Sequence, residues 1–258
     1  GRRSSRMNSV CCLEAGSVGQ YDRRGRITHQ TEYNLRDTTG MTSSSRPVSS
    51  SQRGTHPRLP ELLARHRSRP WREPLADHNV EAIDSLQARL QAETRPLVLD
   101  SFCGTGQSTR WLSERYPDCL VIGIDQSAHR LARHDKAQAS DYLLLQADCE
   151  PIWRFLADSG QRLRAHYLLY PNPWPKPGHL QRRVHGHPAF PLLLALGGRI
   201  ELRSNWQLYA EEFGVAMSLS GRPGRVQRVD ASTALSLFER KYRNSGHALW
   251  AFVSEPAM

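Results

Sequence analysis

Short apolar runs alternate with helical segments over residues 97–253, and this alternation limits the fold more than any other feature. Apolar runs at residues 97–100, 120–125, 142–145, 167–170, 199–202, 225–229 and 248–253 predict seven strands. Helices are expected at residues 107–115, 127–134, 151–157, 188–196 and 206–217. Because most strands alternate with helices and are apolar throughout, we expect an α/β fold, with helices on both faces of a mostly parallel, seven-stranded sheet.

The chain divides into three regions: two that precede the α/β pattern and one that contains it. Residues 1–55 are rich in Arg, Ser, Thr and Gly without an apolar period, so we expect a disordered or non-native leader, with Met41 as a possible true start. Residues 56–96 are expected to be helical, and residues 97–258 to form the α/β domain.

The helical region contains two expected helices. A short basic helix is predicted near residues 59–67 and a longer one at residues 79–91. Asn79 stands where a residue could cap the second helix. Its apolar face would consist of Val80, Ile83, Leu86 and Leu90.

The chain is strongly basic, with a formal net charge of +10. Lys136, Lys176 and Lys241 are the only lysines among 35 basic residues, so the rest are arginines, which suit bidentate phosphate contacts. This balance favours a polyanionic partner such as RNA, although a GC-rich coding sequence would also enrich arginine.

Other classes of protein fit the sequence poorly. No run approaches the roughly 20 apolar residues of a membrane helix, and no signal peptide is recognisable. The five cysteines include no metal-type pair, so we expect no metal, free thiols and a cytoplasmic location. The sequence leaves open whether the protein is a monomer or a homodimer.

A glycine-rich turn follows the first expected strand. It reads Asp100-Ser-Phe102-Cys-Gly104-Thr-Gly106 and leads directly into a helix. Glycines in this context let the backbone approach a ligand, toward which the helix N-terminus points N–H groups. The third glycine of a dinucleotide motif is replaced by Thr109. The turn therefore predicts a nucleotide-like ligand of another kind.

Two further carboxylates follow the next strands. Asp125 ends the second strand, at the spacing of residues that accept ribose hydroxyls, and Asp148 follows the third strand. With Asp100, these acids would lie at three successive strand ends.

A rigid basic loop follows the fourth strand, from residue 170 to residue 183. It contains Pro-Asn172-Pro-Trp174-Pro-Lys176, followed by His179, Arg182 and Arg183. Ligands bind at the carboxyl ends of strands in open α/β sheets, so the loop should face the glycine turn. Its stiffness, its flat Trp ring and its charge suit an RNA base beside a phosphate backbone, although a solvated charged loop around a structural Trp is the alternative.

These motifs resemble two nested groups of enzymes. The Asp-x-Phe-x-Gly-x-Gly turn resembles motif I of class I methyltransferases that use S-adenosylmethionine. The loop is similar to the signature of bacterial tRNA (guanine-N7-)-methyltransferases. Three more blocks agree in order, at residues 202–211, 237–240 and 246–250. The resemblance covers about residues 97–253 and implies a Rossmann-like fold and methyl transfer to N7 of a variable-loop guanine in tRNA.

The resemblance also implies roles for particular residues. The cofactor would be held by Asp100, Phe102, Gly104, Gly106, Asp125, Asp148 and Asn172. Catalysis would rest on Asn172, Asn205 and Glu239. The substrate would be held by Lys176, His179, Arg182, Arg183, Asn205, Ser236 and Glu239. Asp148 would take the adenine amino group.

The chain departs from the family at several of these positions. Asn172 and Asn205 replace aspartates, Ser236 and Leu237 replace Thr and Lys, and Phe102 replaces a usual Gly. Guanine N7 carries a lone pair and no proton, so its methylation needs no general base. An Asn can still accept a hydrogen bond from guanine, but it stabilises developing positive charge less well than a carboxylate.

Two alternatives follow from these departures. Asn-Pro followed by an aromatic residue resembles methyltransferases that act on exocyclic amines, so another RNA base or a small-molecule amine could be the target. The chain could also be a non-catalytic RNA-binding relative that retains its cofactor.

Overall fold

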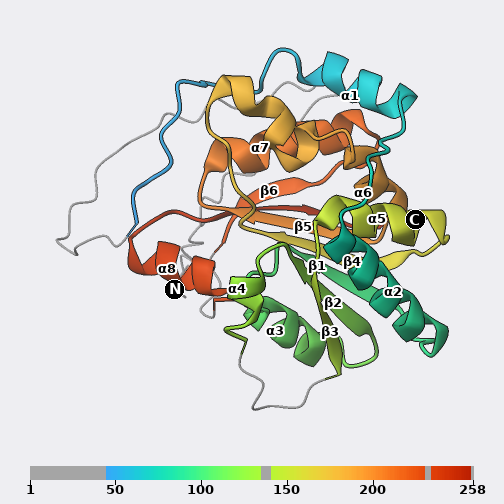
Figure 1. Ribbon diagram of the computed structural model, residues 1–258. Coiled ribbons are helices and arrows are strands. Elements are labelled where there is room, and N and C mark those ends of the chain that lie inside the picture. The colour runs from blue at the N-terminus through green and yellow to red at the C-terminus, as the bar shows by residue number, and fades with distance from the viewer. Residues whose placement is uncertain (1–44, 135–140, 230–233, 257–258) are drawn as a thin grey trace, which may run out of the picture.

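The computed structural model describes residues 45–134, 141–229 and 234–256. Its centre is one seven-stranded sheet with the order β3-β2-β1-β4-β5-β7-β6 (Figure 1). The strands are β1 (Leu97–Ser101), β2 (Leu120–Asp125), β3 (Tyr142–Gln146), β4 (Leu163–Leu169), β5 (Arg199–Ser204), β6 (Arg225–Arg228) and β7 (Trp250–Ser254). Strands β1 to β5 are parallel, and β7 runs antiparallel to both β5 and β6. The predicted Rossmann-like, mostly parallel sheet is confirmed.

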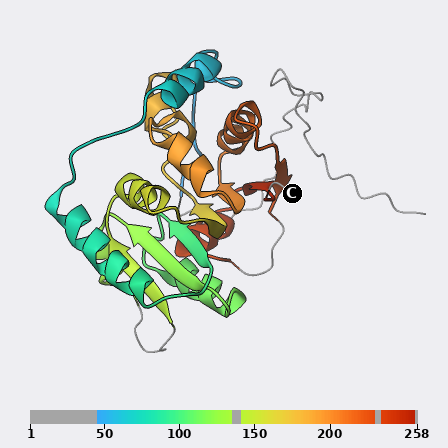
Figure 2. The same cartoon turned by 90° about the vertical axis from the view of Figure 1, so that its right-hand side faces the viewer.

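Helices cover both faces of this sheet. They are α1 (Leu59–Ser68), α2 (Asp77–Gln91), α3 (Gln107–Arg115), α4 (Ala128–Leu131), α5 (Cys149–Asp158), α6 (Phe190–Leu196), α7 (Gln207–Leu219) and α8 (Leu237–Asn244). Two 3-10 turns, η1 (Pro177–Arg182) and η2 (Val184–Gly186), precede α6. In Figure 2 a long connection joins α1, which lies against α6 and α7, to α2, which lies beside α5 and β3.

The side chains of the central strands alternate between two hydrophobic cores. Leu97 and Leu99 of β1 belong to the larger core, with α1, α2, α5, α6 and α7, whereas Val98 belongs to a smaller core with α3 and α8. All five β1 residues are buried. Both faces of the strand are therefore covered, as its apolar sequence predicted.

Helix α2 differs from its prediction in both its cap and its buried face. It begins at Asp77 with Ala76 at the N-cap, so Asn79 lies inside the helix. The Asn79 amide is buried and exchanges two hydrogen bonds with Asp148, at 3.0 and 2.9 Å. The buried face therefore includes Asn79, and Val80 is 42% exposed.

The N-terminal region is ordered further than we expected. We expected disorder up to residue 55, yet Ser50 and Gln52 make hydrogen bonds to residues more than 100 positions away. Residues 1–44, including Met41, lie outside the described residues.

Three smaller observations complete the fold. Helix α4 is shorter than the predicted helix at residues 127–134, and α8 was not predicted. Cys103, Cys119 and Cys149 are buried free thiols. In the described part of the chain, every helix is too short or too polar to cross a bilayer.

Candidate active site

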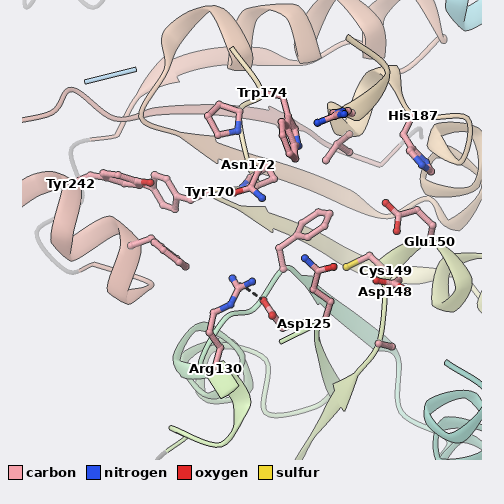
Figure 3. A pocket seen from close by; sticks show the side chains of 18 residues that line it. Asp125, Arg130, Asp148, Cys149, Glu150, Tyr170, Asn172, Trp174, His187 and Tyr242 are labelled. Atoms are coloured by element: carbon pink, nitrogen blue, oxygen red, sulfur yellow. Dashed lines mark ion pairs between the residues drawn. The ribbon is translucent and has the colours of Figure 1, made fainter. Parts of the chain in front are cut away.

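A pocket opens where the strand order reverses. β2 lies on one side of β1 and β4 on the other, so the connections after β1 and β4 leave the sheet in different directions, and a crevice forms between them. The pocket there has a volume of about 240 Å³ (Figure 3). It is lined by Phe102, Asp125, Gln126, Arg130, Ala147, Asp148, Cys149, Glu150, Tyr170, Pro171, Asn172, Pro173, Trp174, Arg182, Val184, His187, Phe238 and Tyr242.

The glycine-rich turn forms one edge of this pocket. Gly104 and Gly106 have φ values of +63° and +77°, which glycine adopts without steric cost. The Gly104 N–H donates to the Asp125 carboxylate at 2.9 Å, and Gly106 is the N-cap of α3. Phe102 is the residue of this turn that lines the pocket, and neither glycine does, so the contact of Gly104 and Gly106 with a cofactor stays a prediction.

Two of the predicted carboxylates lie on the pocket wall. Asp125 is 2% exposed, accepts N–H bonds from Gly104 and Ser127 and lies 3.4 Å from Arg130. Asp148 is held by the Asn79 amide and lies 3.4 Å from His78. Asp125 Oδ1, which accepts from Ser127 alone, retains a lone pair for a further donor, whereas Oδ2 already faces both Gly104 and Arg130.

Asp100 lies behind the turn and is absent from the pocket wall. It is fully buried, and its Oδ2 accepts hydrogen bonds from Ser108 at 2.6 Å and Thr109 at 2.8 Å. Burial raises the pKa of Asp100 to about 6, against the opposing effect of these two bonds. Its Oδ1 has no hydrogen-bond partner, and a buried acceptor without a donor usually awaits water or a ligand.

Three strained residues surround the pocket. Phe102, Tyr170 and Trp174 are the non-glycine residues with positive φ among those described, at +64°, +57° and +45°, and all three line it. Bulky residues in this conformation cost about 1–2 kcal/mol each and cluster at ligand sites. Phe102 occupies the position where the related family usually has Gly, and its ring packs edge-on against Trp153.

The loop after β4 places its predicted residues in different environments. Asn172 is exposed and lines the pocket (Figure 3). The Arg182 guanidinium lies 4.9 Å from the centre of the Trp174 ring. Lys176 is exposed, and His179 packs edge-on against Trp174, but neither lines the pocket.

Arg183 does not have the role that the sequence suggested. We expected it to meet RNA, but its side chain is 0% exposed. Its guanidinium binds the Glu212 carboxylate and the carbonyl oxygens of Trp174 and Lys176. A buried arginine with these partners holds the loop, so the prediction of an RNA contact is wrong for Arg183.

Two residues predicted near the base are also absent from the pocket wall. Asn205 is hydrogen-bonded to His247 at 3.1 Å. Ser236 caps α8 by accepting the Glu239 N–H at 3.1 Å. Both side chains therefore bind other parts of the protein and do not line the pocket.

Glu239 is the largest departure from the predicted site. Its carboxylate is fully buried and is bound by Arg203 at 3.1 Å and Arg243 at 3.0 Å. It therefore joins α8 to β5 and does not face the pocket.

Several pocket residues were missed from the sequence. Phe238 and Tyr242 lie four residues apart on α8, so they share one helix face, and Tyr242 packs 5.5 Å from Tyr170. That spacing was visible in the sequence, but the helix was not predicted. Glu150 and Arg130 also line the pocket and carried no recognisable signal.

The pocket has two chemically different sides (Figure 3). Asp125, Asp148 and Glu150 make one side acidic, whereas Tyr170, Trp174 and Tyr242 make the opposite side aromatic. The described residues contain no group of three side chains arranged to hold a metal ion. The arrangement suits a polar organic ligand placed against a flat ring.

Known proteins resemble this chain over most of its length. A family model described as "Putative methyltransferase" matches residues 94–251, more than half of the chain. The tRNA (guanine-N(7)-)-methyltransferase of Rubrobacter xylanophilus is 28% identical over 67% of this chain and 79% of its own. That of Sodalis glossinidius is 28% identical over 70% and 80%, and that of Treponema pallidum is 30% identical over 60% and 64%. A solved antibiotic-related methyltransferase superposes with a TM-score of 0.49 at 15% identity, over 72% of this chain and 97% of that one. Through the match of the family model to residues 94–251, the chain belongs to this family of methyltransferases.

Proposed function

We propose that this protein transfers a methyl group from S-adenosylmethionine to N7 of a variable-loop guanine in tRNA. The observation that carries the proposal is the two-sided pocket: carboxylates at strand ends face the Pro-Asn-Pro-Trp loop across it. The named relatives are tRNA (guanine-N(7)-)-methyltransferases, and the chain spans about four fifths of the length of the first two.

The acidic side would hold the cofactor. Asp125 would accept the ribose hydroxyls, and Asp148, already fixed by Asn79, would accept from the adenine amino group. Asp100, whose Oδ1 has no hydrogen-bond partner, is fully buried and off the pocket wall, so Phe102 is the residue of the glycine turn that would contact the cofactor. S-adenosylmethionine supplies an electrophilic methyl group when bound.

The aromatic side would orient the base. Trp174, Tyr170 and Tyr242 offer flat surfaces for a purine, and Asn172 can accept a hydrogen bond from its N1–H or amino group. Because N7 carries a free lone pair, these side chains need only position the guanine and stabilise the positive charge that develops on it.

The exposed part of the loop would contact the RNA backbone. Lys176 and Arg182 are exposed on this loop, and Arg182 also lines the pocket, in a chain with a net charge of +10. Phosphate contacts of this kind position a nucleic acid without reading its sequence.

A second candidate function is methylation of an exocyclic amine. It is favoured by Asn172, which lies on the pocket wall beside Pro173 and Trp174 where the related family has Asp. An Asn carbonyl accepts from an NH₂ group as readily as from a ring N–H.

One experiment separates these functions. The full chain would be incubated with labelled S-adenosylmethionine and total tRNA from a strain without its own guanine-N7 enzyme, and the modified nucleosides identified by mass spectrometry. We expect 7-methylguanosine. Another methylated nucleoside would favour the amine-methylating function. Cofactor binding without transfer to any RNA would contradict the proposal and leave the non-catalytic relative.

A further inference from the structure

Residues 50–56, here called the strap, run beside the loop after β4, although more than 100 residues separate them. In Figure 1 the strap belongs to the blue segment that leads to α1 near the 3-10 turns. Ser50 Oγ donates to the Pro175 carbonyl oxygen at 2.5 Å. The strap therefore contacts the Pro-Asn-Pro-Trp-Pro-Lys motif directly, at its fifth residue.

The carbonyl groups on either side of Pro175 are also held. Arg183 donates through Nε to the Trp174 oxygen at 3.2 Å and through Nη2 to the Lys176 oxygen at 3.4 Å. Three consecutive carbonyl groups thus have side-chain donors, one from the strap and two from a buried arginine. Trp174, the first of the three residues, has the strained φ of +45°.

Arg183 is fixed in turn by Glu212 on α7. Glu212 is fully buried and also accepts from His185 Nε2 at 3.1 Å and from the backbone N–H of His56 at 2.7 Å. Burial alone would raise the pKa of Glu212, but the bond from His185 and the nearby charges lower it to about 2. The ion pair therefore persists at neutral pH on a helix packed against the sheet.

Gln52 joins the strap to both ends of this ion pair. Its Oε1 accepts from Arg183 Nη2 at 2.9 Å, and its Nε2 donates to Glu212 Oε1 at 2.9 Å. Only an amide offers one acceptor and two donors in this arrangement, and the second donor reaches the Gly54 oxygen at 2.8 Å. A leucine of similar size would remove both bonds: Arg183 Nη2 would keep the Lys176 oxygen as a partner, and Glu212 Oε1 would keep the His56 N–H, so each buried group would lose one of its two partners.

From this chain of contacts we infer that the strap is a positioning element for the substrate loop. Ser50 and Gln52 act as positioning residues: they hold the backbone of residues 174–176 so that Trp174 and Asn172 face the pocket. The inference rests on the proposed function for what the loop binds, but the ordering of the loop can be measured without any substrate.

The test compares Ser50→Ala and Gln52→Leu in the full chain with the unaltered protein. We expect backbone amides of residues 174–187 to exchange with deuterium about tenfold faster in Gln52→Leu, because buried polar partners are lost. We expect kcat/KM for tRNA to fall about tenfold, mostly through KM, and the Kd for S-adenosylmethionine to change less than twofold. Ser50→Ala should show the same pattern at smaller size, and Ser50→Thr, which keeps the hydroxyl, should restore it.

Gln91→Leu is the matched control, since Gln91 is exposed at the end of α2. It should leave loop exchange and kinetics unchanged. Unchanged loop exchange in Gln52→Leu would overturn the inference, whether or not activity falls. If Gln52→Leu does not fold, Ser50→Ala against Ser50→Thr decides. An unaltered protein that methylates no tRNA would refute the proposed function, while the exchange data would still decide the role of the strap.

Discussion

The acidic and the aromatic side of the pocket differ in how well the sequence predicted which residues line them. On the acidic side, both predicted residues, Asp125 and Asp148, lie on the pocket wall, and their contact with a cofactor stays a prediction. On the opposite side, Asn172 lies on the wall, but Asn205, Ser236 and Glu239 do not. Asp125 ends β2 and Asp148 follows β3, so the sheet fixes both, whereas Ser236 caps and Glu239 belongs to a helix whose orientation depends on tertiary contacts.

The largest expected effect concerns Glu239, whose substitution should impair the protein only by destabilising the fold. Glu239→Ala removes the α8 partner of the buried Arg203, which then keeps Glu201 as its partner, so the free energy of unfolding should fall by about 3 kcal/mol, the lower end of the cost of breaking a buried ion pair. Denaturant unfolding measures this change. Glu255→Ala, which removes an exposed partner of Arg199, should cost below about 1 kcal/mol. A Glu239→Ala protein that is stable but inactive would instead support a direct contact between Glu239 and the guanine.

Asp125 should show the reverse behaviour, with a large effect on ligand binding. Asp125→Ala removes the acceptor expected for the ribose hydroxyls and releases the Gly104 N–H, so Kd for S-adenosylmethionine should rise about hundredfold. Calorimetric titration measures it, with the exposed Asp118→Ala as the control. A rise below threefold would place the cofactor elsewhere.

Asp100 should make stability depend on pH. Its pKa is about 6 in the folded protein and lower when unfolded, so its stabilising contribution is complete below about pH 4 and is lost as the pH rises through 6. The free energy of unfolding of the natural chain should fall by about 1–3 kcal/mol between pH 4 and pH 7, relative to that of the Asp100→Asn variant. Parallel pH profiles for the two proteins would contradict the raised pKa.

Asn172 offers the smallest change and the sharpest comparison. Asn172→Asp restores the family's carboxylate on the pocket wall and should raise the rate of guanine methylation about tenfold, because it stabilises positive charge on the purine. Single-turnover kinetics measure this rate. Asn205→Asp, at a residue bonded to His247 and away from the wall, should change it less than twofold. Equal gains in rate in both variants would show that the aromatic side of the pocket extends to Asn205.

The same contrast explains how much could be predicted. The sheet followed from strand periodicity, and Asp125 from its place at a strand end. Nothing in the local sequence distinguishes Arg182 from Arg183, yet Arg182 stacks on Trp174 and Arg183 is buried. The partner that buries Arg183 is Glu212, which lies 29 residues further along the chain and so leaves no local signal. Ser236 and Glu239 did carry a local signal, since Ser-x-x-Glu is a helix-capping pattern.

The three anchored carbonyl groups of residues 174–176 bear on the thermodynamics of RNA binding. Ordering a residue's backbone costs about 1–2 kcal/mol in conformational entropy. Here side chains of the protein itself order the loop, so this cost belongs to folding and does not recur when a base arrives. Mild denaturant should therefore weaken RNA affinity before it weakens cofactor affinity, since Trp174 of this loop is expected to orient the base, whereas Asp125 and Asp148 at the strand ends are expected to hold most of the cofactor.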